Sequence, residues 1–166
     1  MKTVLAKLRP MGQIIYVDAD ACPVKDEIIK VANRHRLTVC LVSNGGIRPH
    51  RDPLVQIVIV AEGPDVADKW IADRASPGDI VVTSDIPLAA KVVAKAVVTL
   101  RHNGDEFTAQ NIGAQLATRD LMADLRAADP LMMGAGKQHG NAFSKQDRSR
   151  FLERLEASVH KAKGLS

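Results

Sequence analysis

The sequence predicts an α/β fold: a single domain built on a central five-stranded parallel sheet, in the strand order 3-2-1-4-5, with helices on both faces. Two observations predict this class. Short runs of Val, Ile and Leu alternate along the chain with segments whose apolar residues recur at helical spacing, which is typical of parallel sheets joined by crossover helices. The strand-like runs are also almost continuously apolar, as a sheet covered on both faces requires.

We expect the domain to span residues 13–162 of the 166. Residues 1–12 are interpreted as an N-terminal extension, either disordered or a tag, because Met11 offers a second start. Apolar residues make up 46% of the chain and charged residues 25%, proportions that suit one globular domain with a sizeable core.

Five short segments are expected to form the strands, because they are apolar and rich in β-branched residues. They are residues 13–18, 37–43, 55–60, 79–84 and 97–100. Between the second and third, Gly45 and Gly46 with two nearby prolines mark a loop.

Three helices are expected to follow the first, third and fourth strands. Pro23 suits the first turn of the first helix, which continues to His35. Asp65 is expected to cap the second helix, and Pro77 ends it. The third carries apolar residues at helical spacing over residues 88–96.

Two further helices are expected near the C-terminal end. Thr108 is a candidate cap for a long helix that Pro130 closes. Ser144 is expected to cap the last helix, whose buried face would carry Phe151, Leu155 and Val159.

Composition restricts the function classes. No apolar run is long enough to cross a membrane, and the first residues lack the apolar core of a signal peptide. Cys22 and Cys40 lack a CxxC spacing, so they suggest neither a zinc site nor a redox motif, and they fit a reducing cytosol. We therefore expect a cytoplasmic protein with no membrane partner.

A net charge of +4 and a pI of about 9.2 permit a polyanionic partner. The oligomeric state stays open.

Polar and acidic residues follow the predicted strands where each of them ends. In an open parallel sheet, ligands bind beyond these carboxyl ends, so the residues there are candidates for a site. They are Asp18 and Asp20 after the first strand, Ser43, Asn44 and Arg48 after the second, Glu62, Asp65 and Asp68 after the third, and Thr83, Ser84 and Asp85 after the fourth.

Aspartates gathered at one edge predict a metal site. Carboxylates brought close together repel and raise one another's pKa values unless a cation lies among them. Oxygen ligands without His or Cys favour Mg²⁺ or Mn²⁺, which act on phosphate esters. Each acid also has a structural alternative: Asp85 can cap a helix, and Asp20 and Asp68 can complement helix dipoles. Asp18, directly ending an apolar strand, is the hardest to explain structurally.

Several motifs carry a resemblance to a known family. They are DADACPVK at 18–25, LVSN at 41–44 with Arg48, DVADKWI at 65–71, TSDIPLA at 83–89, Arg119 with Asp120, and FSKQDRSRF at 143–151. Together they resemble the YaiI/YqxD family over nearly the whole chain from Ile14 onward. That family is placed among PIN-like domains, so the resemblance implies a PIN-like fold.

The wider resemblance to PIN nucleases implies residue roles. PIN nucleases have an aspartate at the end of the first strand, which Asp18 matches, and a D-x-x-I-A-x-x-A helix, which begins here at Asp68. Their T-x-D turn after the fourth strand is matched by Thr83 and Asp85. A further acid usually lies on a helix between the early strands. This sequence has no clear counterpart, and Asp20 is the candidate substitute.

The leading hypothesis is therefore a Mg²⁺- or Mn²⁺-dependent nuclease acting on RNA. The metal would be held by the catalytic set Asp18, Asp20, Asp68 and Asp85. Substrate phosphates would contact Lys25, Asn44 and Arg48, and a metal-bound water would be oriented by Thr83 or Ser84.

Two alternatives stay open. A phosphatase of the haloacid dehalogenase type would use Asp18 as the nucleophile of a D-x-D signature, although Cys22 stands where that signature usually has Thr or Val. A non-catalytic RNA-binding module would keep the fold with an incomplete site.

Overall fold

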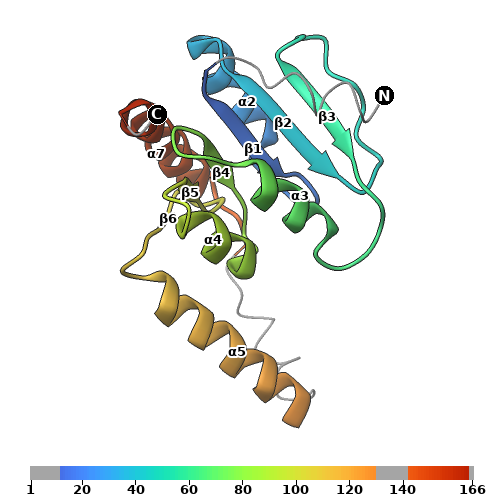
Figure 1. Cartoon of the computed structure of the whole chain (residues 1–166), viewed down its shortest axis with the longest axis vertical. Helices are drawn as coiled ribbons and strands as arrows, with labels where there is room; N and C mark the ends of the chain where they lie inside the picture. The colour runs from blue at the N-terminus through green and yellow to red at the C-terminus, as the bar shows by residue number, and fades with distance from the viewer. Residues whose placement is uncertain (1–11, 130–141, 165–166) are drawn as a thin grey trace.

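The protein, described here by a computed structural model for residues 12–129 and 142–164, has one six-stranded sheet in the order β3-β2-β1-β4-β5-β6 (Figure 1). The expected extension at residues 1–12 lies, apart from Gly12, outside the described residues. The strands are β1 (Ile14–Asp18), β2 (Thr38–Ser43), β3 (Val55–Ile59), β4 (Ile80–Val82), β5 (Val98–Leu100) and β6 (Glu106–Phe107). The helices are α2 (Lys25–His35), α3 (Val66–Arg74), α4 (Ile86–Val93), α5 (Ile112–Ala128) and α7 (Lys145–Lys163).

The predicted strand order is confirmed for the first five strands, which are all parallel. β1 lies at the centre between β2 and β4, so Asp18 at its end has neighbouring strands on both sides. The order reverses between β1 and β4, and such a point is where open sheets of this type bind ligands.

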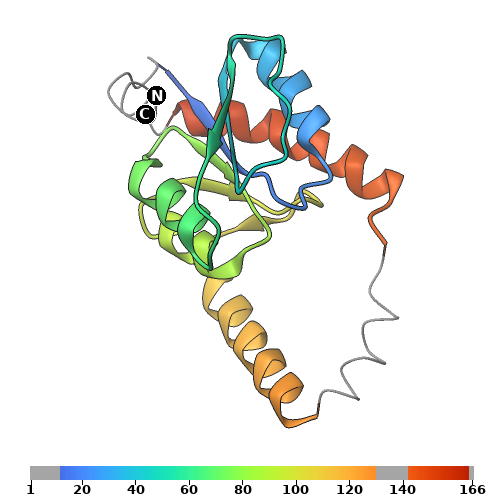
Figure 2. The ribbon, with the colours of Figure 1, turned by 90° about the vertical axis from the view of Figure 1, so that its right-hand side faces the viewer.

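Helices cover both faces of the sheet, as predicted (Figure 2). On one face, α2 and α7 pack their buried residues, including Ile28 and Phe151, against alternate side chains of the central strands. On the other face, α3 and α4 contribute Ile71 and Leu88 to a second cluster. The two clusters use opposite faces of β1 because successive side chains of a strand point in opposite directions.

The sixth strand, β6, was not predicted. It pairs antiparallel to β5, with Phe107 opposite Thr99. A tight turn makes this pairing: Arg101 N donates to Asp105 O at 2.8 Å, and Gly104 within the turn has a φ of 93°, a conformation that glycine adopts easily. The strand is two residues long, too short for an alternating pattern to be visible in the sequence.

Helix α5 extends away from the sheet (Figures 1 and 2), and none of its residues is buried. Leu121, Met122 and Leu125 are 58%, 43% and 47% exposed. The expected cap was wrong: the helix begins after Asn111, and Thr108 Oγ1 instead accepts from Asn111 N in the preceding turn, at 3.1 Å.

The last helix, α7, agrees with the prediction. Ser144 Oγ accepts from Asp147 N, and the Asp147 carboxylate accepts from Ser144 N in return, which completes a capping box. Phe151, Leu155 and Val159 are fully buried against the sheet. None of the helices in the described parts of the chain is long and apolar enough to cross a membrane.

Candidate functional site

The four candidate aspartates come from four separate positions at the carboxyl edge of the sheet. Asp18 ends β1, and Asp20 follows it in the turn before α2. Asp68 lies in the first turn of α3, and Asp85 directly precedes α4. Asp20, Asp68 and Asp85 all lie near enough to Asp18 for their charges to raise the pKa of its carboxyl group. The topology therefore brings together the residues that the sequence singled out.

Asp18 and Asp85 are linked through Thr83. The Thr83 hydroxyl donates to Asp18 Oδ2 at 3.2 Å, and Thr83 Oγ1 accepts from Asp85 N at 2.9 Å. Asp85 Oδ1 in turn accepts from Leu88 N at 3.1 Å, so Asp85 caps α4. Thr83 is fully buried. Thr83 therefore fixes the Asp18 carboxylate. Asp85 both caps α4 and belongs to the cluster of acids.

Asp20 is held by the end of β2. Its Oδ1 accepts from Ser43 Oγ at 2.7 Å, and its Oδ2 accepts from Asn44 N at 3.1 Å. Asn44 therefore contacts the cluster through its backbone. Ser43, the last residue of β2, was expected among the polar residues at this edge, but no role was predicted for it. These bonds hold the Asp20 carboxylate at the end of β2 rather than at the start of α2.

Asp68 is the buried member of the cluster. Its side chain is 4% exposed, and its Oδ2 accepts from Lys91 Nζ at 3.1 Å across the α3–α4 contact. Its other oxygen, Oδ1, is buried and has no hydrogen-bond partner among the described residues. Lys91 was also missed, because nothing in the sequence shows which side chain of α4 faces α3.

Burial and mutual repulsion raise the pKa of two of these carboxyl groups. For Asp18 the main cause is burial, opposed by the Thr83 hydrogen bond and reinforced by the charges of Asp85, Asp20 and Asp68. For Asp68 the main cause is again burial, opposed by Lys91. Both sites therefore penalise the ionised form, which is the situation that a nearby cation relieves.

The donor set fits a hard divalent cation such as Mg²⁺ or Mn²⁺. It consists of carboxylate oxygens with nearby hydroxyls, and the unpartnered Oδ1 of Asp68 is available as a ligand. Among the described residues, no three of these acids bring ligand atoms within 4.8 Å of one another. An ion shared by three of them therefore requires side-chain movement. The Lys91 ammonium is the cation that neutralises Asp68 in this structure.

The remaining candidates are less closely tied to the acids. Lys25 is the first residue of α2 and is half-buried, whereas Arg48 and Ser84 are exposed. None of the three side chains makes a hydrogen bond or an ion pair with the described residues. Asp65 occupies the N-cap position of α3 but its side chain makes no capping bond, so its expected capping role was wrong. Its φ of 67° is left-handed, whereas capping side chains need an extended backbone.

A groove of about 370 Å³ lies beside the acidic edge, between the start of α4 and α5. Ile86, the residue after Asp85, lines it together with three arginines: Arg101, Arg119 and Arg126. Arg119 and Arg126 are both on α5, whereas Arg101 follows β5, so the fold brings Arg101 to the other two. A groove with three guanidinium groups is suited to binding phosphate groups.

We expect the capping role of Asp85 to be measurable without metal. Asp85→Asn keeps an acceptor for Leu88 N and removes a charge that repels Asp18, so it should be at least as stable as the wild type. Asp85→Ala loses the cap and should be about 1 kcal/mol less stable than Asp85→Asn. Urea denaturation in EDTA measures the difference, and equal stabilities of the two variants would contradict the capping role.

Comparison with known proteins gives a consistent result. The sequence model of a family described as "Uncharacterized BCR, YaiI/YqxD family" matches residues 16–161. A UPF0178 protein of Ruegeria pomeroyi is 62% identical over 148 residues, covering 89% of this chain and 94% of that protein. A UPF0178 protein of Agrobacterium fabrum is 51% identical over 156 residues, covering 94% of this chain and 99% of that protein. No solved structure matches the chain.

Proposed function

The chain belongs to the YaiI/YqxD family, and from this premise we propose that it is a Mg²⁺- or Mn²⁺-dependent nuclease that hydrolyses RNA phosphodiesters. The observation that carries the proposal is the cluster of four aspartates at the reversal point of the sheet, where burial and repulsion raise the pKa of Asp18. Repulsion among these acids costs stability unless a cation lies among them.

The metal ligands in this proposal are Asp18, Asp68 and Asp85, with Asp20 supplying a further oxygen. When bound, the ion supplies charge stabilisation at the phosphate and lowers the pKa of a coordinated water. The protein holds the carboxylates in place: Thr83 fixes Asp18, and Ser43 with Asn44 N fixes Asp20. Lys91, which pairs with Asp68 in the absence of the ion, would be released to pair with a bound phosphate.

A polyanionic substrate agrees with the surroundings of the cluster. Arg101, Arg119 and Arg126 line the groove that begins next to Asp85, so a nucleic-acid strand entering the acidic edge would meet cations there. These arginines are better supported as phosphate contacts than Arg48, because Arg48 does not line this groove. RNA is the substrate implied by the resemblance to PIN nucleases.

The test is a cleavage assay on end-labelled single-stranded RNA and on an RNA hairpin, with Mg²⁺, with Mn²⁺ and with EDTA. We expect cleavage that requires metal and that falls about 100-fold or more in Asp18→Asn, since the lost ligand contributes several kcal/mol of transition-state stabilisation. Asp26→Asn is the matched control, because Asp26 is exposed in the first turn of α2 and should leave the rate unchanged.

Other outcomes separate the alternatives. RNA binding without cleavage in either metal would contradict the proposal and favour a non-catalytic binding module. Release of phosphate from a phosphomonoester, lost in Asp18→Asn, with no RNA cleavage would favour the phosphatase hypothesis. Cleavage that persists in Asp18→Asn would show that the activity does not arise at this cluster.

A further inference from the structure

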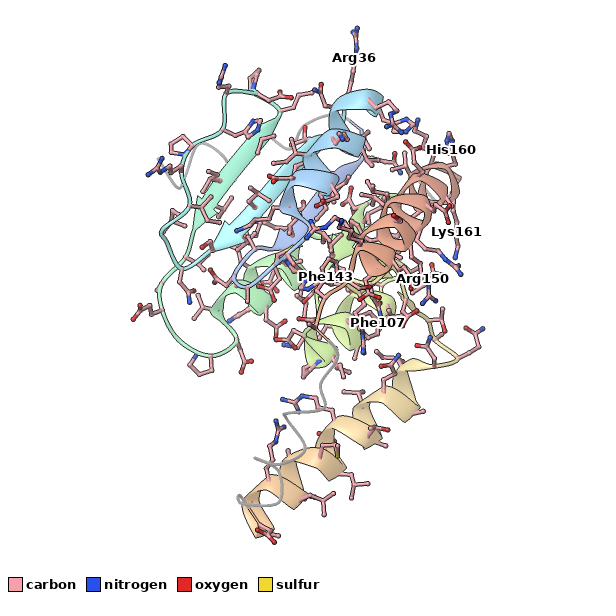
Figure 3. The ribbon with its side chains drawn as sticks, turned by 180° about the vertical axis from the view of Figure 1, so that it is seen from behind. Arg36, Phe107, Phe143, Arg150, His160 and Lys161 are labelled. Atoms are coloured by element: carbon pink, nitrogen blue, oxygen red, sulfur yellow. The ribbon has the colours of Figure 1, made fainter. Side chains whose placement is uncertain are left out.

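A second group of potential metal ligands lies at the opposite edge of the sheet, where α2 and α7 end. His35 is the last residue of α2, and Glu156 and His160 are one turn apart on the same side of α7. Gln13, directly before β1, donates to Val159 O at 3.0 Å, which holds this part of α7 at the beginning of the strands. Figure 3 shows His160 on α7 near the end of α2.

The three side chains converge. One ligand atom from each of His35, Glu156 and His160 lies within 4.8 Å of the other two. His35 Nε2 and Glu156 Oε2 are 2.7 Å apart, and the two imidazole rings meet edge to face with their centroids 5.5 Å apart. Within residues 12–129 and 142–164, this is the one set of three His, Cys, Asp or Glu residues that approach so closely.

The ligand chemistry differs from that of the aspartate cluster. Two imidazoles and one carboxylate form a set that proteins use for Zn²⁺, with a fourth position left for water or another ligand. Imidazole nitrogen disfavours Mg²⁺ and Ca²⁺, which take oxygen ligands. A Zn²⁺ ion bound at about 2.0–2.2 Å from each ligand needs the ligand atoms about 3.4 Å apart, so only a small movement from the present separation is required.

The surroundings allow that movement and direct it. His35 and Glu156 are 16% and 28% exposed, so both are largely fixed by the helix contact, whereas His160 is exposed and able to turn toward them. Arg34 pairs with the other carboxylate oxygen, Glu156 Oε1, and leaves Oε2 facing His35. Such outer partners orient metal ligands. The Arg34 charge opposes a cation weakly, because its side chain is 59% exposed and therefore screened.

We propose that His35, Glu156 and His160 form a Zn²⁺ site that joins the end of α2 to α7. The ion takes the place of the hydrogen that His35 Nε2 and Glu156 Oε2 share, and His160 supplies the third ligand. Because these residues belong to two helices far apart in the sequence, the bound ion stabilises the packing of α7 on the domain. The site lies at the other edge of the sheet from the aspartates and does not depend on the nuclease proposal.

Titration of the tag-free, full-length protein with Zn²⁺, after EDTA treatment and dialysis, tests the site by calorimetry and by melting temperature. We expect a site for one ion and a melting temperature about 5–10 °C higher when free Zn²⁺ exceeds the dissociation constant about 100-fold. His160→Ala should weaken binding about tenfold or more, since one of three ligands is lost. His160→Cys, which supplies another zinc ligand, should keep it.

Two controls exclude other sources of binding. His50→Ala removes an exposed histidine from a loop and should leave the affinity unchanged. Asp18→Asn should also leave it unchanged, which separates this site from the acidic edge. Because His160 is exposed, His160→Ala in EDTA should melt like the wild type.

Three results would overturn the proposal. They are the absence of Zn²⁺ binding by the wild type, binding by His160→Ala that is as tight as in the wild type, and equal loss of affinity in His50→Ala. Co²⁺ gives a check that needs no variant: the wild type with one equivalent should show the visible absorption bands of a four-coordinate ion, and bands of six-coordinate, hydrated Co²⁺ alone would also overturn it.

Discussion

Phe151→Ala is expected to lower the free energy of unfolding by about 3–5 kcal/mol. Phe151 is fully buried and is among the largest side chains of the core, where α7 meets the sheet. Truncation removes its apolar contacts and leaves a cavity, because the surrounding strands belong to a continuous sheet and cannot collapse into the space. A loss of this size is a large part of the stability of a domain of this length.

Urea denaturation monitored by far-ultraviolet circular dichroism measures the loss, with Glu153→Ala as the matched control on the same helix. Glu153 is exposed, so its replacement should change stability by no more than about 0.5 kcal/mol. A loss below about 1 kcal/mol in Phe151→Ala would mean that α7 contributes little to the core.

Helix α7 also shows why much of the fold could be predicted from the sequence. Its start depends on Ser144 and Asp147, three residues apart, and its buried face on apolar residues at helical spacing. Both are local patterns. The parallel strands were equally visible, because a sheet buried on both faces needs continuous apolar runs, and the crossover rules then leave few possible strand orders.

The parts that could not be predicted depend on contacts between distant segments. Helix α5 has apolar residues at helical spacing like any packed helix, yet Leu121 and Leu125 are exposed in the structure. Spacing shows that a helix has an apolar side, but it does not show what covers that side. β6 is too short to carry a pattern, and the arginine groove combines residues from separate parts of the chain.

The candidate site divides in the same way. The sheet edge on which the aspartates gather follows from topology alone, since parallel strands end at a common edge. The partners of the individual acids follow only in part. The sequence predicted that Asp85 can cap a helix, and it caps α4, but Asp65 sits at a cap position without capping. Lys91 reaches Asp68 only because α3 packs against α4, and its position decides the charge of the site.

Lys91→Met is the second substitution with a large expected effect. In the protein without metal it should lower the free energy of unfolding by about 2 kcal/mol. Removing one partner of a buried ion pair costs about 3–5 kcal/mol, and the smaller value expected here reflects the exposure of Lys91, which is 51%, against 4% for Asp68. The variant leaves Asp68 with two oxygens that no side chain neutralises, since Oδ1 already has no partner. Lys95→Met, in the turn that follows α4, is the control, because the Lys95 ammonium donates to the Ala72 carbonyl and not to an acid.

The loss should depend on pH with a defined sign. Burial already raises the pKa of Asp68 above 3.8, and Lys91 opposes that rise, so the pKa should rise further in Lys91→Met. When the pKa of a carboxyl group is higher in the folded than in the unfolded state, the folded protein loses stability as the pH rises from 3.8 through the folded pKa. The stability that Lys91→Met loses relative to the wild type should therefore be largest at neutral pH and shrink as the pH falls into that window.

Mn²⁺ should reverse the loss, and this result links the ion pair to the proposed metal site. In the wild type the Lys91 ammonium occupies Asp68 Oδ2 and repels an incoming cation, whereas in Lys91→Met both carboxylate oxygens are available. The rise in melting temperature caused by Mn²⁺ should therefore be larger in Lys91→Met than in the wild type or in Lys95→Met. If Mn²⁺ raises all three melting temperatures equally, or none of them, Asp68 is not a metal ligand and its pairing with Lys91 serves only the packing of α3 on α4.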